Sequence, residues 1–234
     1  MKKLIKLREK IQTKQAKVAV IGLGYVGLPV SCMLAEAGFQ VTGVDIKQDR
    51  VDMINGGQSP IEGREPGLSE LLTKVVENGH FKATTDYAAL KDVDIFLIDV
   101  ETPIDENHIP QYKALKSACE SIASIMKNGA LVIVESTIAP GAMDTVVRPI
   151  LEDVSSKKSK DGFFLGACPE RVMPGKLIAN LREMSRVCGG ETSEVAELMT
   201  FFYRHIVQAD LDPADLITAE LTKTAENAYR DVNI

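Results

Sequence analysis

The sequence predicts an α/β protein, with a doubly wound parallel sheet followed by the start of a long central helix. Short apolar runs alternate with amphipathic helical patterns along the chain of 234 residues, as expected for strands joined by crossover helices. Several runs are continuous stretches of Val, Ile and Leu, which is typical of strands with both faces buried. A glycine-rich turn follows the first run, where a helical pattern begins.

The elements are expected in regular alternation. We predict strands at residues 18–21, 40–44, 93–100, 130–135, 163–168 and 206–208. Amphipathic helices fit between them at residues 26–37, 67–78, 112–127, 141–151 and 192–204. The polar segment 155–162 reads as a surface loop.

Three parts of the chain differ in pattern. Residues 1–16 read as an N-terminal helical extension, with Leu4, Leu7 and Ile11 at helical spacing. Because this extension lacks the apolar run and cleavage site of a secretory signal, we expect it to pack on the domain, with partner or membrane binding as the alternative. Residues 17–212 form the sheet domain. Residues 213–234 begin a helix without a stop signal, so we expect a truncated protein.

Composition narrows the class of partner. The net charge is −6, which argues against nucleic acid or an anionic membrane surface. No apolar stretch approaches the roughly 18 residues of a membrane span. The cysteines are Cys32, Cys119, Cys168 and Cys188. They lack metal-ligand spacing, so we expect no metal site and reduced thiols in a cytoplasmic protein.

The glycine-rich turn has the GxGxxG spacing of a dinucleotide site. Gly22 allows a tight turn, Gly24 admits a pyrophosphate close to the backbone, and Gly27 permits close packing of helix and strand. Amides at the start of the helix then face the phosphates. Together with Tyr25 and Val26 in the same turn, these residues predict a Rossmann-like cofactor site.

An acid after the second strand predicts which cofactor binds. Asp45 lies 18 residues after Gly27, where a carboxylate binds both ribose hydroxyls and repels the 2′-phosphate of NADP. NAD is therefore favoured, although Lys47 and Arg50 nearby leave NADP open. The alternative is an ordinary glycine turn, with Asp45 capping a helix.

Three polar clusters follow predicted strands, at residues 100–105, 135–141 and 168–175. Ligands of open α/β sheets bind at such strand ends, so we expect the three clusters to share one cleft. Taken singly, each cluster has a capping or turn interpretation.

A fourth cluster lies on the terminal helix. Lys223 and Asn227 are one helical turn apart and project from the same face. Glu220, Glu226 and Arg230 accompany them. A solvated charged stripe is the alternative, which Asn227 weakens because asparagine has poor helix propensity.

The four clusters together resemble the UDP-sugar 6-dehydrogenase family. The similar segments are GxGxVGLP from Gly22, STxxPG from Ser136, PERxxPG from Pro169 and ExxKxxENxYR from Glu220. The resemblance covers essentially the whole chain. It implies two successive NAD-dependent oxidations of a sugar C6 alcohol to a carboxylate, and a homodimer formed through the terminal helix.

Residue roles follow from the same resemblance. Thr137 and Glu170 would position or activate water, Lys223 would stabilise an oxyanion, and Asn227 would assist it. The residues implied to line the nicotinamide side are Glu101, Thr102, Ser136 and Thr137. The implied substrate-binding residues are Glu170, Arg171, Val172, Lys223, Asn227 and Arg230. The family's nucleophilic cysteine is matched by none of the four present, and we expect it beyond Ile234. Cys168 reads as a small residue closing a strand.

The motifs VETPID, CPERVMPGK and SRVCGG look most like enzymes that oxidise UDP-N-acetylhexosamines, in particular UDP-N-acetylmannosamine. UDP-glucose and UDP-N-acetylglucosamine remain alternative substrates. A NAD-binding module without turnover is a second hypothesis. A third is another hydroxyl-oxidising dehydrogenase, of the 3-hydroxyacid or 6-phosphogluconate type, which the PERVMPG segment fits poorly.

Overall fold

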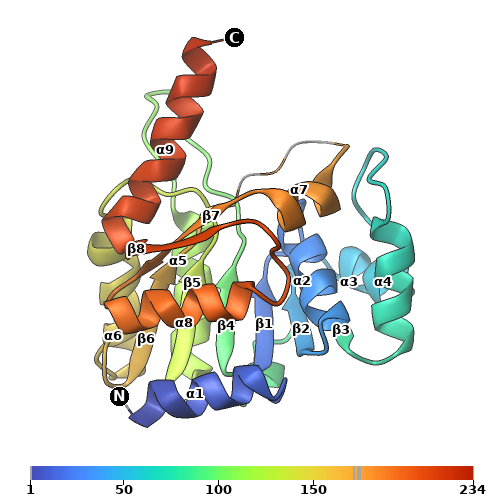
Figure 1. The fold of residues 1–234 in the computed structure, drawn as a ribbon, viewed down its shortest axis with the longest axis horizontal. Helices are drawn as coiled ribbons and strands as arrows, with labels where there is room; N and C mark the ends of the chain where they lie inside the picture. The colour runs from blue at the N-terminus through green and yellow to red at the C-terminus, as the bar shows by residue number, and fades with distance from the viewer. Residues whose placement is uncertain (1, 171, 173–174, 234) are drawn as a thin grey trace.

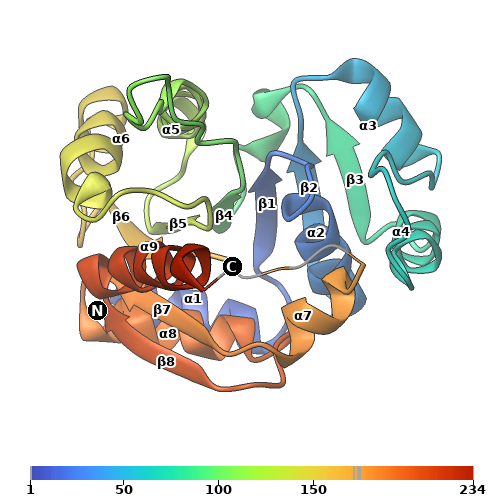
Figure 2. The ribbon, with the colours of Figure 1, turned by 90° about the horizontal axis from the view of Figure 1, so that it is seen from above.

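A computed structural model describes residues 2–170, 172 and 175–233. Its described strands form one sheet in the order β3-β2-β1-β4-β5-β6-β7-β8, with helices on both faces (Figures 1 and 2). The strands are β1 (Lys17–Ile21), β2 (Gln40–Val44), β3 (Phe81–Thr84), β4 (Ile95–Ile98), β5 (Ala130–Val134), β6 (Phe163–Ala167), β7 (Arg186–Gly190) and β8 (Leu211–Asp215).

The first six strands run parallel, whereas β7 pairs antiparallel with β6 and parallel with β8. The order of the parallel strands is that of the doubly wound dinucleotide-binding fold. The predicted fold class is therefore confirmed, with an antiparallel extension at one edge.

Helices cover the sheet in two layers. They are α1 (Lys2–Gln12), α2 (Gly27–Glu36), α3 (Gln48–Asn55), α4 (Leu68–Glu77), α5 (Lys113–Ile125), α6 (Arg148–Ser155), α7 (Leu177–Glu183), α8 (Ser193–Tyr203) and α9 (Leu216–Val232), with short turns η1 (Tyr87–Leu90) and η2 (Met143–Val147). One apolar cluster joins α1, α2, α4, α7 and α8 to the sheet. The other contains α5, α6 and the base of α9.

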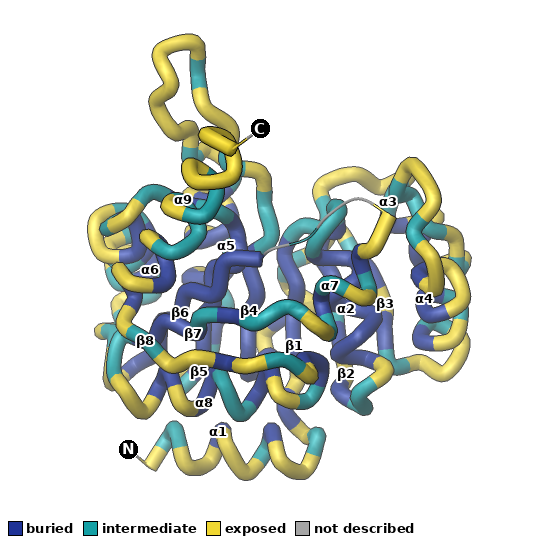
Figure 3. The backbone as a smooth tube through the Cα atoms, turned by 45° about the horizontal axis from the view of Figure 1, so that its top comes forward, coloured by how far each residue is buried: buried dark blue, intermediate teal, exposed yellow. Residues whose placement is uncertain are grey.

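Alternation along each strand supplies both clusters. In β1, Val18 and Val20 face the first cluster, while Ala19 and Ile21 face the second. The central strands β4, β5 and β6 are buried along their whole length (Figure 3), because side chains of a strand point to opposite faces and both faces are covered.

The N-terminal extension packs on the domain, as predicted. Leu7 and Ile11 of α1 are buried, and the Arg8 guanidinium lies 4.1 Å from the ring centre of Phe201 on α8. Lys10 pairs with Asp94 at 2.7 Å. Its basic residues thus anchor the helix at the edge of the sheet where the parallel strands begin.

Several elements differ from the prediction. Strands β3, β7 and β8 and helices α3 and α7 were missed, because these are short segments with weak periodicity. Residues 206–208 form no strand in the described structure. Val207 is buried in the connection from α8 to β8. The residues around it are therefore apolar because they pack against the core, and not because they form a strand.

The terminal helix begins later than Asp212 and Pro213 suggested. Both residues lie in β8, and α9 starts at Leu216, where the Asp215 carboxylate accepts the Thr218 amide at 2.8 Å. The expected boundary at 212/213 therefore falls inside β8. Leu216, the first residue of α9, is buried against the second cluster.

Among the described residues, no helix combines the length and the apolar character needed to cross a membrane.

Candidate functional site

The turn between β1 and α2 requires glycine at two places. Gly22 has φ +95°, and a Cβ there would lie 2.4 Å from the backbone oxygen of Asp99. A Cβ on Gly27 would lie 2.0 Å from the oxygen of Gly22. Because real Cβ atoms cannot approach so closely, both residues have the packing roles that the sequence predicted. The turn therefore rests directly on the end of β4.

The same turn is open at Gly24. The nearest heavy atom to a Cβ built on Gly24 is Arg50 Nη1, at 3.9 Å, so the backbone is open to a ligand there. Asp45 follows β2, and its Oδ2 accepts the Leu23 amide at 3.1 Å. Arg50 donates to the Leu23 oxygen at 3.1 Å. The carboxylate, the arginine and the glycine turn thus lie together, and they fit a dinucleotide whose ribose reaches Asp45.

Tyr25 joins this turn to the third polar cluster. Its hydroxyl donates to Glu65, which also accepts the amides of Gly175 at 2.8 Å and Leu177 at 3.1 Å. Burial, followed by the hydrogen bond to Glu65, raises the pKa of Tyr25 to about 12. Glu65 was missed from sequence, since it lies in a loop without a motif. Val26 precedes α2 as its N-cap residue.

The first and second polar clusters meet at the ends of β4 and β5. The Thr102 hydroxyl donates to the Thr137 oxygen at 2.7 Å. The Ser136 hydroxyl donates to the Val100 oxygen at 2.7 Å. The structure therefore brings together three residues predicted to line the cofactor, with Thr137 half-buried between them.

Helix α9 is attached to the same edge through Glu220. Its two carboxylate oxygens accept the amides of Gly141 and Met143, each at 2.7 Å, so the buried acid caps the loop that follows Thr137. Lys223 is half-buried, three residues further along. Since positions three apart share a helix face, Lys223 follows Glu220 on the side of α9 toward this loop.

The rest of α9 projects beyond the sheet (Figure 1). There the Asn227 oxygen accepts Arg230 Nη2 at 2.9 Å, so these two predicted substrate residues contact each other. Val172 is partly buried against the first cluster. Arg171, also predicted to bind substrate, lies outside the described residues.

Glu170 belongs to a buried polar cluster that was not recognised from sequence. Arg186 on β7 lies 2.7 Å from Glu170 and 3.6 Å from Glu135. The Tyr203 hydroxyl donates to Glu135 at 2.6 Å. Asp99, at the end of β4, completes the cluster, where its buried carboxyl group interacts with that of Glu135. The sequence signals were an arginine inside the apolar strand RVCGG and acids directly after two strands.

Burial shifts the titration of this cluster. It raises the pKa of Asp99 well above the ordinary value, with the charge of Glu135 adding to the effect. Burial also raises the pKa of Glu135, although Arg186 opposes it. Burial by itself would lower the pKa of Arg186, but the neighbouring groups, Glu170 first among them, together outweigh burial and raise it. Burial therefore favours the protonated forms of Asp99 and Glu135, and the surrounding acids favour the charged form of Arg186.

Cys168 is poorly suited to be a nucleophile. Its sulfur lies 4.0 Å from that of Cys188, and the contact with Cys188 together with burial raises the pKa of Cys168 well above the usual range. A nucleophilic cysteine needs the opposite shift. Within the described part of the chain, no group of His, Cys, Asp and Glu side chains could hold a metal ion.

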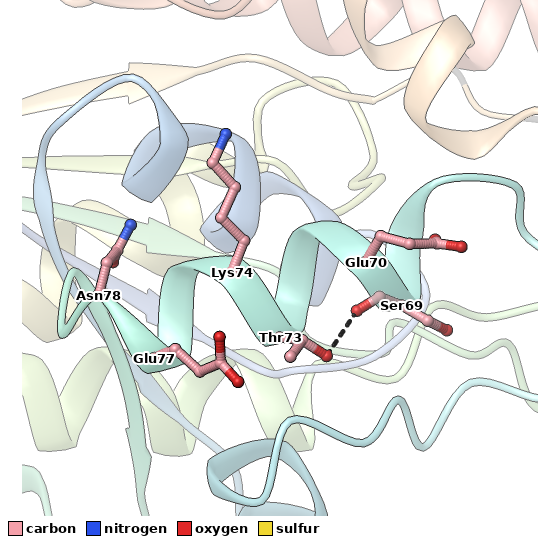
Figure 4. A pocket seen from close by; sticks show the side chains of 6 residues that line it. All are labelled: Ser69, Glu70, Thr73, Lys74, Glu77 and Asn78. Carbon is pink, nitrogen blue, oxygen red and sulfur yellow. Dashed lines mark hydrogen bonds between the residues drawn. The ribbon is translucent and has the colours of Figure 1, made fainter.

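A surface hollow on α4 is lined by Ser69, Glu70, Thr73, Lys74, Glu77 and Asn78 (Figure 4). None of these residues belongs to the polar clusters. Lys74 pairs with Glu36 at 3.0 Å, as on an ordinary solvated helix face. The candidate site is therefore the edge of the sheet where the parallel strands end.

Comparison with known proteins agrees with this location. Residues 16–207 match the UDP-glucose/GDP-mannose dehydrogenase family, NAD binding domain. The chain is 40% identical over 225 residues to the UDP-N-acetyl-D-mannosamine dehydrogenase of Campylobacter jejuni, covering 93% of this chain and 54% of that protein.

Two solved structures are also similar. One is a UDP-D-ManNAc dehydrogenase from Pyrococcus horikoshii, with TM-score 0.89, 37% identity, and coverage of 93% of this chain and 51% of that one. The other is an NDP-N-acetyl-D-galactosaminuronic acid dehydrogenase from Methanosarcina mazei Go1, with TM-score 0.90, 34% identity and coverage of 99% and 50%. The chain thus spans about half the length of the relatives it matches.

Proposed function

This chain belongs to the UDP-glucose/GDP-mannose dehydrogenase family and contains its NAD-binding domain, and we propose that it serves an enzyme oxidising the C6 alcohol of a UDP-N-acetylhexosamine to the uronic acid. The proposed substrate is UDP-N-acetyl-D-mannosamine, because relatives from Campylobacter jejuni and Pyrococcus horikoshii carry that name. The four buried, reduced cysteines support a reducing compartment such as the cytoplasm.

One observation carries the proposal: the glycine turn, the Thr102–Thr137 contact and the buried Glu170 all lie at the same edge of one sheet. An edge of this kind can hold a dinucleotide beside a carboxylate and a hydroxyl. The substrate carbon is therefore expected between the nicotinamide and Glu170.

The residues of this chain have separate tasks in the proposed mechanism. Gly24 and the first amides of α2 hold the diphosphate, and Asp45 accepts the ribose hydroxyls. NAD supplies the hydride acceptor when bound. Glu170, with Thr137, orients a water molecule and takes its proton. Lys223 stabilises negative charge on the substrate oxygen.

Asn227 and Arg230 are proposed to hold the substrate together with Val172 and Arg171. The nucleophile of the covalent step is proposed to come from a cysteine outside these 234 residues, because burial and Cys188 suppress the thiolate of Cys168. Without that cysteine, the chain is expected to bind NAD but not to turn over.

The test is a substrate and cofactor panel on the full-length protein. UDP-N-acetyl-D-mannosamine with NAD should yield two NADH per sugar, and UDP-glucose, UDP-N-acetylglucosamine and NADP should be poorer. NAD binding by calorimetry without turnover of any UDP-sugar would favour the NAD-binding module instead.

We also propose that α9 forms a homodimer contact. Its exposed apolar side chains are Ile217, Leu221, Tyr229 and Val232, and exposed apolar surface can mark a contact with another protein. Light scattering should give twice the protomer mass, and Leu221→Glu should shift it toward the monomer. A monodisperse monomer at tens of micromolar would contradict this proposal.

A further inference from the structure

The loop that joins β5 to η2, residues 135–142, is held in its first half by two side chains from other segments. Thr102, which follows β4, donates its hydroxyl to the Thr137 backbone oxygen at 2.7 Å. Tyr112, which directly precedes α5, accepts the Ala139 amide at 2.8 Å through its hydroxyl. The backbone from Thr137 to Ala139 is therefore fixed by contacts with segments that are distant in sequence.

Glu220 of α9 holds the second half of the same loop. Its carboxylate oxygens accept the amides of Gly141 and Met143, which lie 79 and 77 residues away in sequence, each at 2.7 Å. These amides lie at the start of the helical segment formed by η2 and α6, where unpaired N–H groups and the helix dipole stabilise a carboxylate. Glu220 is 1% exposed, so water does not compete for them. The acid therefore caps this segment from another helix.

Glu220 is also the last buried residue among the described positions of α9. The buried residues of this helix are Leu216, Ala219 and Glu220, and the later described positions are half-buried or exposed. The base of the helix packs closely on β7, since a Cβ on Gly189 would lie 2.6 Å from the Cβ of Ala219. Beyond Glu220 the helix leaves the domain (Figure 1). Glu220 is therefore the buried anchor nearest to Lys223, three residues further along.

Glu220 thus joins the two segments that carry groups proposed to act on the substrate. Thr137 lies in the loop, and Lys223 lies on the helix. Displacement of such groups by about 1 Å can lower a rate roughly 100-fold. A cap that served stability alone would have no reason to join these two segments, because any polar side chain at the loop could satisfy the same amides.

We propose that Glu220, together with Tyr112, is a positioning residue that holds Thr137 in a fixed place relative to Lys223. This inference rests on the proposed function for the roles of Thr137 and Lys223. Glu220 acts through the loop amides that it accepts, because it has almost no exposed surface of its own. The glycine turn follows β1, which β4 separates from β5, so the diphosphate side of the NAD site should be little affected.

Kinetics of the full-length enzyme with NAD and UDP-N-acetyl-D-mannosamine test the proposal. Glu220→Gln keeps the size of the side chain but replaces one acceptor oxygen by an NH2 group, which cannot accept an amide. Release of the loop should lower kcat about 10- to 100-fold, with KM for NAD close to that of the wild type. A kcat within about twofold of the wild type would overturn the proposal.

Glu191 provides a matched control. Its side chain is fully buried and pairs with Arg148 at 2.8 Å, and it accepts the amides of Lys160 at 3.2 Å and Leu165 at 3.0 Å. It follows β7, at the edge of the sheet where β6 begins. Glu191→Gln should destabilise the protein but leave kcat within about twofold of the wild type. A fall in kcat as large as that in Glu220→Gln would assign the effect to loss of any buried cap and overturn the proposal.

A double-mutant cycle shows whether Glu220 acts through Thr137. Thr137→Ala removes the hydroxyl that Glu220 is proposed to place. Adding Glu220→Gln to Thr137→Ala should therefore lower kcat by a much smaller factor than Glu220→Gln does in the wild type, because residues that act together are not additive. Equal factors in the two backgrounds would contradict the proposal.

NMR of the threonine methyl groups gives a readout that does not require turnover. The Thr137 signal, assigned by its loss in Thr137→Ala, should shift in Glu220→Gln and stay in place in Glu191→Gln. An unmoved signal in Glu220→Gln would overturn the proposal. If no UDP-sugar is oxidised, the proposed function fails, whereas this measurement still tests whether Glu220 places Thr137.

Tyr112→Phe keeps the test decisive if Glu220→Gln does not fold. It removes only the hydroxyl that accepts the Ala139 amide, and the ring still packs against the second apolar cluster. We expect a shift of the Thr137 methyl signal and a smaller fall in kcat than in Glu220→Gln, because the contacts of Glu220 remain. An unmoved Thr137 signal in Tyr112→Phe would again overturn the proposal.

Discussion

Strand β4 has an aspartate at each end, and the fold surrounds the two in opposite ways. Asp94 precedes the strand and is paired with Lys10 at 2.7 Å and Lys127 at 2.8 Å. Asp99 follows the strand and is buried beside Glu135, with Glu170 and Arg186 next to it. One end has more cations than acids, and the other has more acids than cations.

The two ends of β4 differ in what their acids do: Asp94 stabilises the fold, whereas Asp99 lies in the candidate site. Burial alone would raise the pKa of Asp94, but hydrogen bonds from Lys10 and Lys127 hold it below its usual value, so this carboxylate anchors α1 to the sheet. The acid excess at the other end has no such balance. It lies under the glycine turn, where perturbed titration is typical of functional sites.

The largest expected effect is on turnover. Glu170→Gln should lower kcat of the full-length enzyme about 100-fold or more, because a general base is lost, while NAD affinity stays the same. Asp94→Asn, at the other end of β4, should leave kcat within about twofold. Initial rates measure kcat, and calorimetry measures NAD affinity. An equal loss of kcat in the two variants would show that the two ends of β4 do not differ in their importance for turnover.

The next effect is on stability. Asp94→Asn should lower the free energy of unfolding by about 2 kcal/mol near neutral pH, because two lysines lose a buried charged acceptor. The folded pKa of Asp94 is depressed, so its contribution is present above the unfolded pKa and is lost as pH falls through the folded pKa. Urea unfolding at pH 7 and pH 3 should therefore show a smaller difference from wild type at the lower pH.

Asp99→Asn should have a smaller effect of opposite sign. The folded pKa of Asp99 is raised, so its stabilising contribution is complete below the unfolded pKa and declines as pH rises from about 4 toward the folded value. Asparagine resembles the protonated acid and carries no such cost. The variant should therefore gain stability relative to wild type as the pH rises from about 4 to 7. If thermal unfolding instead showed that Asp99→Asn loses as much stability as Asp94→Asn, the two ends of β4 would not differ in the way described.

The smallest effects concern the lysines. Lys10→Met and Lys127→Met should each cost about 1 kcal/mol or less, because both side chains are about one-third exposed and water screens the pairs. The loss should shrink at high salt. Lys17→Met is the control, since its pair with Asp92 is 3.8 Å long and more than half exposed. If Lys10→Met lost as much unfolding free energy as Asp94→Asn, the Lys10–Asp94 pair alone would account for the stabilisation by Asp94.

Much of the fold could be predicted from the sequence. The glycine spacing placed β1 and α2 to within a residue at each end, and the apolar runs located β2, β4, β5 and β6, because strands buried on both faces must be apolar throughout. Strand β7 was missed for the reverse reason. Its residues Arg186, Gly189 and Gly190 break the apolar run. Arg186 pairs with Glu170, and a Cβ on either glycine would collide with a residue of α8 or α9, so these residue types depend on contacts that are distant in sequence.

The candidate site shows the same division. Gly22, Gly27 and Asp45 could be predicted, because their roles depend on a turn and a strand end that are local in the chain. Glu220 was predicted only to accompany Lys223 and Asn227 on the terminal helix, yet it is buried and caps the loop after β5. Charge patterns on a helix cannot show this, since the loop lies about 80 residues away in sequence.

The sequence by itself therefore determined the doubly wound fold, the glycine turn and the cofactor, because each depends on residue types at short spacing. Only the tertiary structure decided which acids share a buried space. Asp99, Glu135, Glu170 and Arg186 come from four separate segments, and their protonation depends on burial and mutual distance. Asp94 and Asp99 are only five residues apart in sequence. Their electrostatic environments are nevertheless opposite, because one lies where β4 begins and the other where it ends, on opposite sides of the sheet.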